Sequence, residues 1–167
     1  ATAAALLAGA GIGDVRRGLQ GFDGLPHRLQ LVAQRDGRSF YNDSLATTPE
    51  SVEMALASFA SPVVLLAGGY DKQVPLEGLA ETIAGGTRAV ALMGQTAEEV
   101  NRLLDELSFG GLRRVCGSLE EAFTWAVEQS ESGDNIVLSP GCASYDWFAS
   151  FRERGDEFTR LAVGPRD

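Results

Sequence analysis

Apolar and polar positions alternate along the chain in blocks that predict strands and helices in turn. Short apolar runs at residues 63–67, 89–93 and 135–139 have the length of strands, and the segments between them carry apolar residues at helical spacing. The predicted helices cover residues 49–59, 76–84, 97–107, 119–128 and 147–161, and a further short strand lies near residues 114–115. Strands that alternate with helices through short loops predict a parallel sheet with right-handed crossovers.

Two short helices are predicted before this alternation begins. Residues 2–9 and 14–19 have helical composition, and a glycine-rich break separates them. The glycines of the break do not form a dinucleotide-binding loop, because that motif requires a strand before it. A second glycine-rich stretch at residues 21–26 ends the helical region. We therefore expect residues 1–21 to be a separate piece from residues 22–167.

A β-hairpin is predicted to open the second piece. The dipeptide Asp36-Gly37 separates two runs of strand character, residues 28–35 and 39–42, and this pair indicates a two-residue turn. The pattern as a whole predicts an α/β fold with a mostly parallel sheet of about six strands and helices on both faces. The continuously apolar runs at 63–66 and 136–138 are predicted to be central strands.

Charge and composition exclude several classes of partner. The 14 Lys and Arg residues against 23 Asp and Glu residues give a net charge of −9, the wrong sign for binding nucleic acid or anionic lipid. No apolar run approaches the roughly 20 residues of a membrane span. The two cysteines have neither C-x-x-C spacing nor a nearby histidine pair, so they fit neither a zinc site nor a disulfide framework. We expect reduced thiols in a cytoplasmic protein.

Polar side chains follow three of the predicted strands at their carboxyl ends. Thr47, Lys72 and Ser144 each come a few residues after such a strand. Because the carboxyl ends of parallel strands meet at one edge of a sheet, we expect these side chains to lie around one crevice. Two hydroxyls, an ammonium and the N-termini of the following helices suit a ligand with carboxylate groups. The sequence therefore predicts a site for an acidic ligand.

Each of these residues also has a structural interpretation that the sequence leaves open. Thr47 fits a capping box with Glu50 at the start of a helix. Ser144 fits a helix N-cap, and Lys72 fits an exposed surface lysine. Cys142, in the turn before Ser144, is either a nucleophile or a buried thiol that packs in a loop.

Further candidates lie near the joint between the two pieces and in the closing helix. His27 and Arg28 lie in that joint, where a ligand held between the pieces is within reach, although His27 is alternatively an exposed loop residue. Asp43 is either an acceptor for a ribose hydroxyl or metal-bound water, or a turn residue. Phe151 either belongs to the core or walls the methylenes of a ligand.

Two common catalytic and nucleotide-binding motifs are absent from the sequence. G-x-S-x-G does not occur, so we assign no catalytic residue, and no set of metal ligands is assigned either. G-x-x-x-x-G-K-[ST] is also absent, so the loop that would bind ATP phosphates is expected upstream of Ala1. A start at Ala1 without Met, and without the basic flank of a signal peptide, fits a fragment of a longer protein.

Five motifs, in this order along the chain, resemble the C-terminal domain of the Mur ligases. They are GLPHR at 24–28, NDSLAT at 42–47, GGYDK at 68–72, LSPGCAS at 138–144 and FRERGDEF at 151–158. Residues 1–21 resemble the last helices of the central ATP-binding domain of that family, and residues 22–167 resemble its amino-acid-binding domain. The resemblance implies a Rossmann-like domain that closes over the central domain.

The resemblance also implies a reaction. In the family, ATP phosphorylates the terminal carboxylate of a nucleotide-linked substrate, and the amine of an amino acid attacks the acyl phosphate. The chain is most similar to members that add D-glutamate to UDP-N-acetylmuramoyl-L-alanine in peptidoglycan synthesis, which supports cell shape and cell division. The resemblance implies that the full-length enzyme uses ATP and Mg²⁺. It also implies that this enzyme is cytoplasmic and monomeric. The fragment alone is expected to need no cofactor and to be folded but inactive.

Motif positions imply roles for individual residues. Those assigned to the carboxylates of D-glutamate are Thr47, Lys72, Ser144 and, through its backbone or ring, Phe151. Those assigned to face ATP are His27, Arg28 and Asp43. Many relatives carry lysine where this chain has Leu45, so one cation that would assist D-glutamate binding is absent.

Two other functions remain open from the sequence. One is a different Mur or folylpolyglutamate-type ligase, which would add another amino acid or extend folate with glutamate. The other is an α/β binding module without catalysis of its own. A panel of amino acids offered to the full-length enzyme would distinguish a different ligase from one that adds D-glutamate. Tight binding of an unrelated metabolite by this chain would indicate a binding module.

Overall fold

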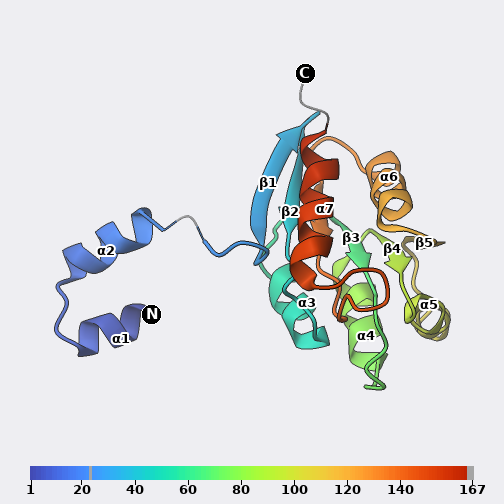
Figure 1. Ribbon diagram of the computed structural model, residues 1–167, viewed down its shortest axis with the longest axis horizontal. Helices are drawn as coiled ribbons and strands as arrows, with labels where there is room; N and C mark the ends of the chain where they lie inside the picture. The colour runs from blue at the N-terminus through green and yellow to red at the C-terminus, as the bar shows by residue number, and fades with distance from the viewer. Residues whose placement is uncertain (23, 165–167) are drawn as a thin grey trace.

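A six-stranded, mostly parallel sheet forms the centre of the part of the chain that the structure describes (Figure 1). This structure is a computed structural model, and it describes residues 1–22 and 24–164. The strands are β1 (Gln30–Arg35), β2 (Arg38–Asn42), β3 (Val63–Ala67), β4 (Ala89–Met93), β5 (Leu112–Cys116) and β6 (Asn135–Leu138). Their order is β1-β2-β6-β3-β4-β5, with β1 and β2 antiparallel and the other pairs parallel. The predicted α/β fold is confirmed.

The hairpin between β1 and β2 forms where the sequence predicts it. Asp36 and Gly37 have φ angles of 52° and 73°, so both central residues of the turn are left-handed. Such a two-residue turn matches the twist of the strands that it joins. The hairpin therefore adds an antiparallel edge to the parallel part of the sheet.

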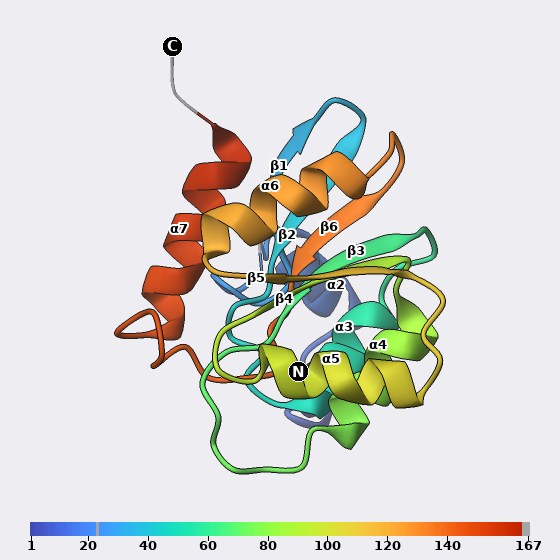
Figure 2. The same ribbon diagram turned by 90° about the vertical axis from the view of Figure 1, so that its right-hand side faces the viewer.

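Helices cover both faces of the sheet (Figure 2). One face carries α3 (Pro49–Leu56), α4 (Glu77–Gly86) and α5 (Ala97–Glu106), and the other carries α6 (Leu119–Gln129) and α7 (Phe151–Val163). Side chains of β3 alternate between the two cores, because successive residues of a strand point to opposite faces. Leu65 packs in the first core, and Val64 and Leu66 pack in the second. Strands β3 and β6 are central and fully buried, as their apolar runs predict.

The closing helix is shorter than the pattern predicts. The pattern predicts it over residues 147–161, but α7 begins at Phe151. The N–H groups of residues 147 and 148 instead donate to the carbonyl oxygen of Ser144 in a turn, at 3.2 and 2.9 Å. Ser150 is the N-cap, and its Oγ accepts a hydrogen bond from the N–H of Glu153 at 3.3 Å. Apolar spacing before the cap was therefore misleading.

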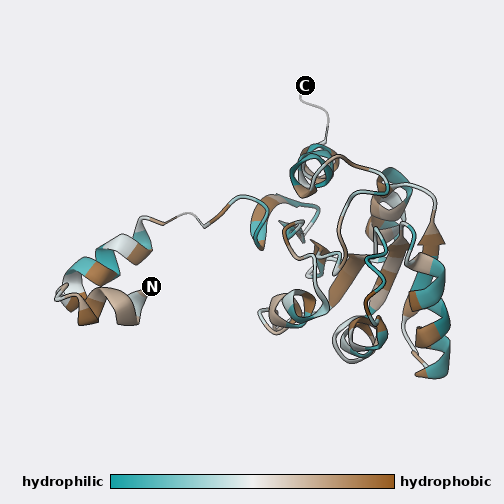
Figure 3. Cartoon of the chain, turned by 60° about the horizontal axis from the view of Figure 1, so that its bottom comes forward, coloured by the Kyte–Doolittle hydropathy of each residue, from teal (hydrophilic) through white to brown (hydrophobic). Residues whose placement is uncertain are grey.

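Two further helices, α1 (Thr2–Leu7) and α2 (Ile12–Gln20), lie to one side of the sheet (Figure 1). Neither helix buries a residue, and Leu7 and Ile12 are 89% and 67% exposed. Figure 3 shows such hydrophobic residues as brown bands on both helices. In residues 1–22 and 24–164, no helix combines the length and the apolar character needed to cross a membrane.

Candidate functional site

The loops that follow β2, β6 and β3 are joined by hydrogen bonds at the carboxyl edge of the sheet. The N–H of Gly68 donates to the carbonyl oxygen of Pro140 at 2.8 Å, and the N–H of Tyr70 donates to that of Ala143 at 2.9 Å. On the other side, the N–H of Gly141 donates to the carbonyl oxygen of Ala46 at 3.0 Å. The predicted convergence of these three loops is therefore confirmed.

Glycine at position 69 permits this close approach. Gly69 has a φ of 154°, and a Cβ atom there would lie 2.3 Å from the carbonyl oxygen of Ala143. Real Cβ atoms essentially never come so close to another heavy atom. The glycine is thus required for the two loops to pair as they do.

The three residues predicted to bind an acidic ligand lie on these joined loops, with different exposures. Ser144 is buried, Thr47 is half-buried and Lys72 is exposed. Lys72 is also the only lysine in the sequence. The loops are neighbours by their backbone contacts, and the gathering of the three side chains around one ligand remains a prediction.

The helix-capping alternatives for two of these residues are wrong. Thr48, not Thr47, is the N-cap of α3, and its Oγ1 lies 3.1 Å from the Oγ of Ser51. Ser144 begins the turn before α7, whose N-cap is Ser150. The sequence places each of these residues within a few positions of a helix start, but it does not fix where the first helical turn closes.

Cys142 has the surroundings of a packed thiol. It is 5% exposed, and its Sγ lies 3.5 Å from the Oγ1 of Thr96. Burial raises the pKa of the Cys142 thiol, while the hydrogen bond with Thr96 and the nearby charges of Arg154 and Lys72 oppose this rise. A buried thiol with a raised pKa holds little thiolate at neutral pH, which favours packing over nucleophilic catalysis.

Asp43 is a buried carboxylate that joins the segment before β1 to the loop after β6. Its Oδ2 accepts a hydrogen bond from the Oγ of Ser139 at 2.7 Å, and its Oδ1 accepts one from the N–H of Leu29 at 2.9 Å. Burial raises the pKa of Asp43, and these two hydrogen bonds and the charge of Arg28 oppose the rise. Asp43 is therefore more than a turn residue.

A cavity of about 430 Å³ adjoins this carboxylate. Its lining includes Arg28, Asp43 and Leu45, together with the side of α3 that carries Met54. Neither Thr47 nor the loops carrying the other two ligand candidates line it. Two of the three residues that the resemblance assigns to ATP, Arg28 and Asp43, thus line the cavity, and His27 does not.

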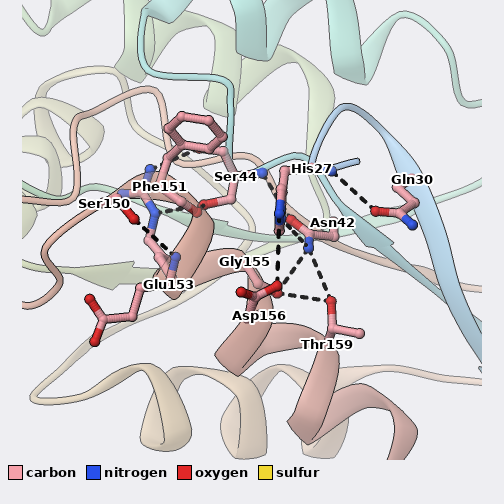
Figure 4. A network of polar contacts seen from close by, with 11 residues as sticks. His27, Gln30, Asn42, Ser44, Ser150, Phe151, Glu153, Gly155, Asp156 and Thr159 are labelled. Atoms are coloured by element: carbon pink, nitrogen blue, oxygen red, sulfur yellow. Dashed lines mark hydrogen bonds and ion pairs between the residues drawn. The ribbon is translucent and has the colours of Figure 1, made fainter. Parts of the chain in front are cut away.

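His27 packs against the first turns of α7 (Figure 4). Its Nδ1 lies 3.1 Å from the Nδ2 of Asn42, and its ring meets the ring of Phe151 edge-on with centroids 5.9 Å apart. The His27 side chain is 12% exposed, and its Nε2 lies 3.8 Å from a carboxylate oxygen of Asp156. The interpretation of His27 as an exposed loop residue is therefore wrong.

Sequence reasoning missed the polar residues that hold the site together. Asn42, which is fully buried, donates to the carbonyl oxygen of Gly155 at 2.9 Å and to the Oγ1 of Thr159 at 3.0 Å. Arg154, which is 2% exposed, donates hydrogen bonds to the Oγ of Ser44 in the loop after β2 and to the carbonyl oxygen of Ala143 in the loop after β6. One signal was present in the sequence, because Arg154 lies at helical spacing from the buried residues Phe158 and Ala162.

Comparisons with known proteins identify related sequences. A family model described as Mur ligase, glutamate ligase domain, matches residues 27–142. A UDP-N-acetylmuramoylalanine–D-glutamate ligase of Geobacillus kaustophilus is 46% identical over 159 residues, which cover 95% of this chain and 35% of that enzyme. The enzyme of the same name from Myxococcus xanthus is 43% identical over 166 residues, covering 96% of this chain and 35% of that enzyme. The chain thus spans about a third of the length of these curated relatives.

Solved structures share the fold at low sequence identity. The UDP-N-acetylmuramate-alanine ligase of Thermotoga maritima matches with a TM-score of 0.69 and 14% identity, over 96% of this chain and 34% of that chain. A Mycobacterium tuberculosis folylpolyglutamate synthase matches with a TM-score of 0.63 and 18% identity, over 95% of this chain and 37% of that chain. The arrangement of strands and helices described above is thus shared with these proteins.

Proposed function

Because the chain belongs to the Mur ligase family, we propose that it is the C-terminal domain of the ligase that adds D-glutamate to UDP-N-acetylmuramoyl-L-alanine. In this peptidoglycan-forming reaction, ATP transfers its γ-phosphoryl group to the substrate carboxylate, which gives an acyl phosphate and ADP. The amine nitrogen of D-glutamate then forms an amide bond with that carbonyl carbon, and phosphate leaves. The proposed enzyme works in the cytoplasm as a monomer.

The role of this chain in that reaction is to bind and orient D-glutamate. The observation that carries the proposal is the joining of three loops at the carboxyl edge of the sheet, each with one ligand candidate. In a chain of net charge −9, the single lysine, Lys72, is located there. An ammonium attracts a carboxylate as a point charge, and the hydroxyls of Thr47 and Ser144 donate hydrogen bonds to it. Holding the amine near the acyl phosphate raises its effective concentration.

The N-terminus of α7 is proposed to add a donor to the same site. Phe151 is the first residue of this helix, so its N–H is one of those without a partner inside the helix. The positive end of the helix dipole favours a carboxylate at this position. We assign Phe151 to D-glutamate through this N–H group, with its ring beside the ligand.

ATP is proposed to approach from the side of the cavity next to Asp43. Arg28 and Asp43 line that cavity, and His27 lies in the adjoining segment. Arg28 suits a phosphate, and the Asp43 carboxylate suits a ribose hydroxyl or a water of the Mg²⁺ shell. In the described residues, no cluster of three or more His, Cys, Asp or Glu side chains could hold a metal. If Asp43 contacts the Mg²⁺ shell, it would do so through a water, and ATP or the rest of the enzyme would supply the direct ligands.

Residues 1–21 are proposed to be the last helices of the central ATP-binding domain, and residues 22–167 the amino-acid-binding domain. Helices α1 and α2 leave Leu7, Ile12 and Leu19 exposed, at 89%, 67% and 55%. Apolar side chains on short helices are stabilised when another surface covers them. The central domain would supply that surface.

An amino-acid panel tests the proposed function. The full-length enzyme is incubated with ATP, Mg²⁺ and UDP-N-acetylmuramoyl-L-alanine, and phosphate release is measured with one amino acid at a time. We expect release with D-glutamate and none with L-glutamate, L-alanine or diaminopimelate. A preference for another amino acid, or for L-glutamate with a folate substrate, would contradict the proposal. The 167-residue chain alone is the matched control and is expected to show no turnover.

A further inference from the structure

Arg154 is a buried guanidinium that contacts several loops of the site. Its Nε donates to the Oγ of Ser44 at 3.0 Å, and its Nη2 donates to the carbonyl oxygens of Ser44 at 3.0 Å and Cys142 at 3.1 Å. Its Nη1 donates to the carbonyl oxygen of Ala143 at 3.1 Å. The side chain thus bridges the loop after β2 and the loop after β6.

The third loop is attached at the same point. The carbonyl oxygen of Ala143 accepts hydrogen bonds from both Arg154 and the N–H of Tyr70, which lies in the loop after β3. A Cβ atom at Gly69 in that loop would lie 3.2 Å from the Nη1 of Arg154. One guanidinium therefore donates hydrogen bonds to two of the loops that carry the proposed ligands of D-glutamate and lies next to the third.

The charge of Arg154 has no direct counterion. Within the described residues, no carboxylate oxygen lies within 4.0 Å of its guanidinium, and the acidic group that acts on it at longer range is Asp146. Burial lowers the pKa of Arg154 to about 10, so the side chain remains charged at neutral pH. A buried charge without a direct partner destabilises a fold, and this cost is offset if the charge attracts an anionic ligand.

We propose that Arg154 is a positioning residue of the D-glutamate site, which holds the loops after β2, β3 and β6 together and supplies positive charge beneath them. The identity of the ligand rests on the function proposed above, whereas the contacts of Arg154 do not. Its hydrogen bonds go to Ser44 and to backbone carbonyls, so Arg154 acts on the ligand through the loops and through its charge. The planar fork of arginine suits several acceptors at fixed angles, which an ammonium cannot match.

Two substitutions in the full-length ligase test this role. Arg154→Met removes the charge and every donor while keeping a long side chain, and Arg154→Lys keeps the charge without the fork. We expect Arg154→Met to raise the KM for D-glutamate about 10- to 100-fold with the KM for ATP nearly unchanged. Arg154→Lys is expected to recover part of this loss. The matched control is Arg160→Met, which removes an exposed guanidinium from the same helix and is expected to change neither constant.

Thermal melting separates this role from a loss of folding. If Arg154→Met does not fold, Ser44→Ala removes the acceptor of Nε and is expected to raise the KM for D-glutamate selectively. In folded variants, unchanged constants or an equal rise in the KM for ATP and D-glutamate would overturn the proposal. A wild-type enzyme that uses another amino acid would instead refute the proposed function, and the KM for that amino acid would then decide the role of Arg154.

Discussion

Lys72→Ala in the full-length ligase is expected to raise the KM for D-glutamate about 10- to 100-fold, because a hydrogen bond to a charged group contributes about 1.5–3 kcal/mol. Lys72 is the only lysine of this chain, and it follows two glycines at the carboxyl end of the central strand β3. No other lysine is present to replace it. Steady-state phosphate release at varied D-glutamate and at varied ATP gives the two KM values.

The KM for ATP decides whether this effect is specific. We expect it to change less than about two-fold, and the same small change is expected for Arg102→Ala, since an exposed ion pair contributes little. Arg102 lies on α5 between Glu99 and Glu106 and is half-exposed. A rise of similar size in both KM values would reject the assignment of Lys72 to D-glutamate.

Gly69→Ala is expected to destabilise the 167-residue chain by at least about 2 kcal/mol, from a strained φ and a forced contact with a neighbouring backbone. The added Cβ would lie 2.3 Å from the carbonyl oxygen of Ala143, which is the acceptor for Tyr70 and Arg154. We expect a fall in Tm of about 4–8 °C. In the full-length enzyme, the KM for D-glutamate should rise as the two loops separate.

Gly78→Ala is the matched control for this substitution. Gly78 lies in α4, and a Cβ atom there would meet no heavy atom within 4 Å. Alanine in a helix is more stable than glycine by about 0.5–1 kcal/mol, so the Tm should stay or rise slightly. Equal Tm values for Gly69→Ala and Gly78→Ala would show that the loops do not pair as described.

The strands were predictable because their residues are buried on both faces. Residues 63–67 and 89–93 are continuously apolar, and the structure forms β3 and β4 with those bounds. The general rule for parallel sheets then placed Lys72 and Ser144 on neighbouring loops, since strands β3 and β6 pair. The sheet topology was therefore enough to predict that these loops converge, without any knowledge of side-chain contacts.

Helix starts and buried polar contacts could not be predicted in the same way. Thr47 and Thr48 are equally good N-caps by residue type, and the choice depends on where the preceding loop is held. Arg154 looks like an exposed arginine of a helix with several charged residues, yet it is 2% exposed. Its acceptors lie on residue 44, which is 110 positions away along the chain, and on residues 142 and 143 in the loop before the helix. Only the folded arrangement brings them together.

The most direct test is an NMR titration of the 167-residue chain with D-glutamate. Because Lys72 is the only lysine, [¹³C]lysine labelling gives one Cε signal, which is followed beside the amide signals of Thr47 and Ser144. If these residues surround one ligand, all three signals shift with the same midpoint. A Lys72 signal that stays in place, or that shifts with a different midpoint from the two amides, would contradict a shared site for D-glutamate.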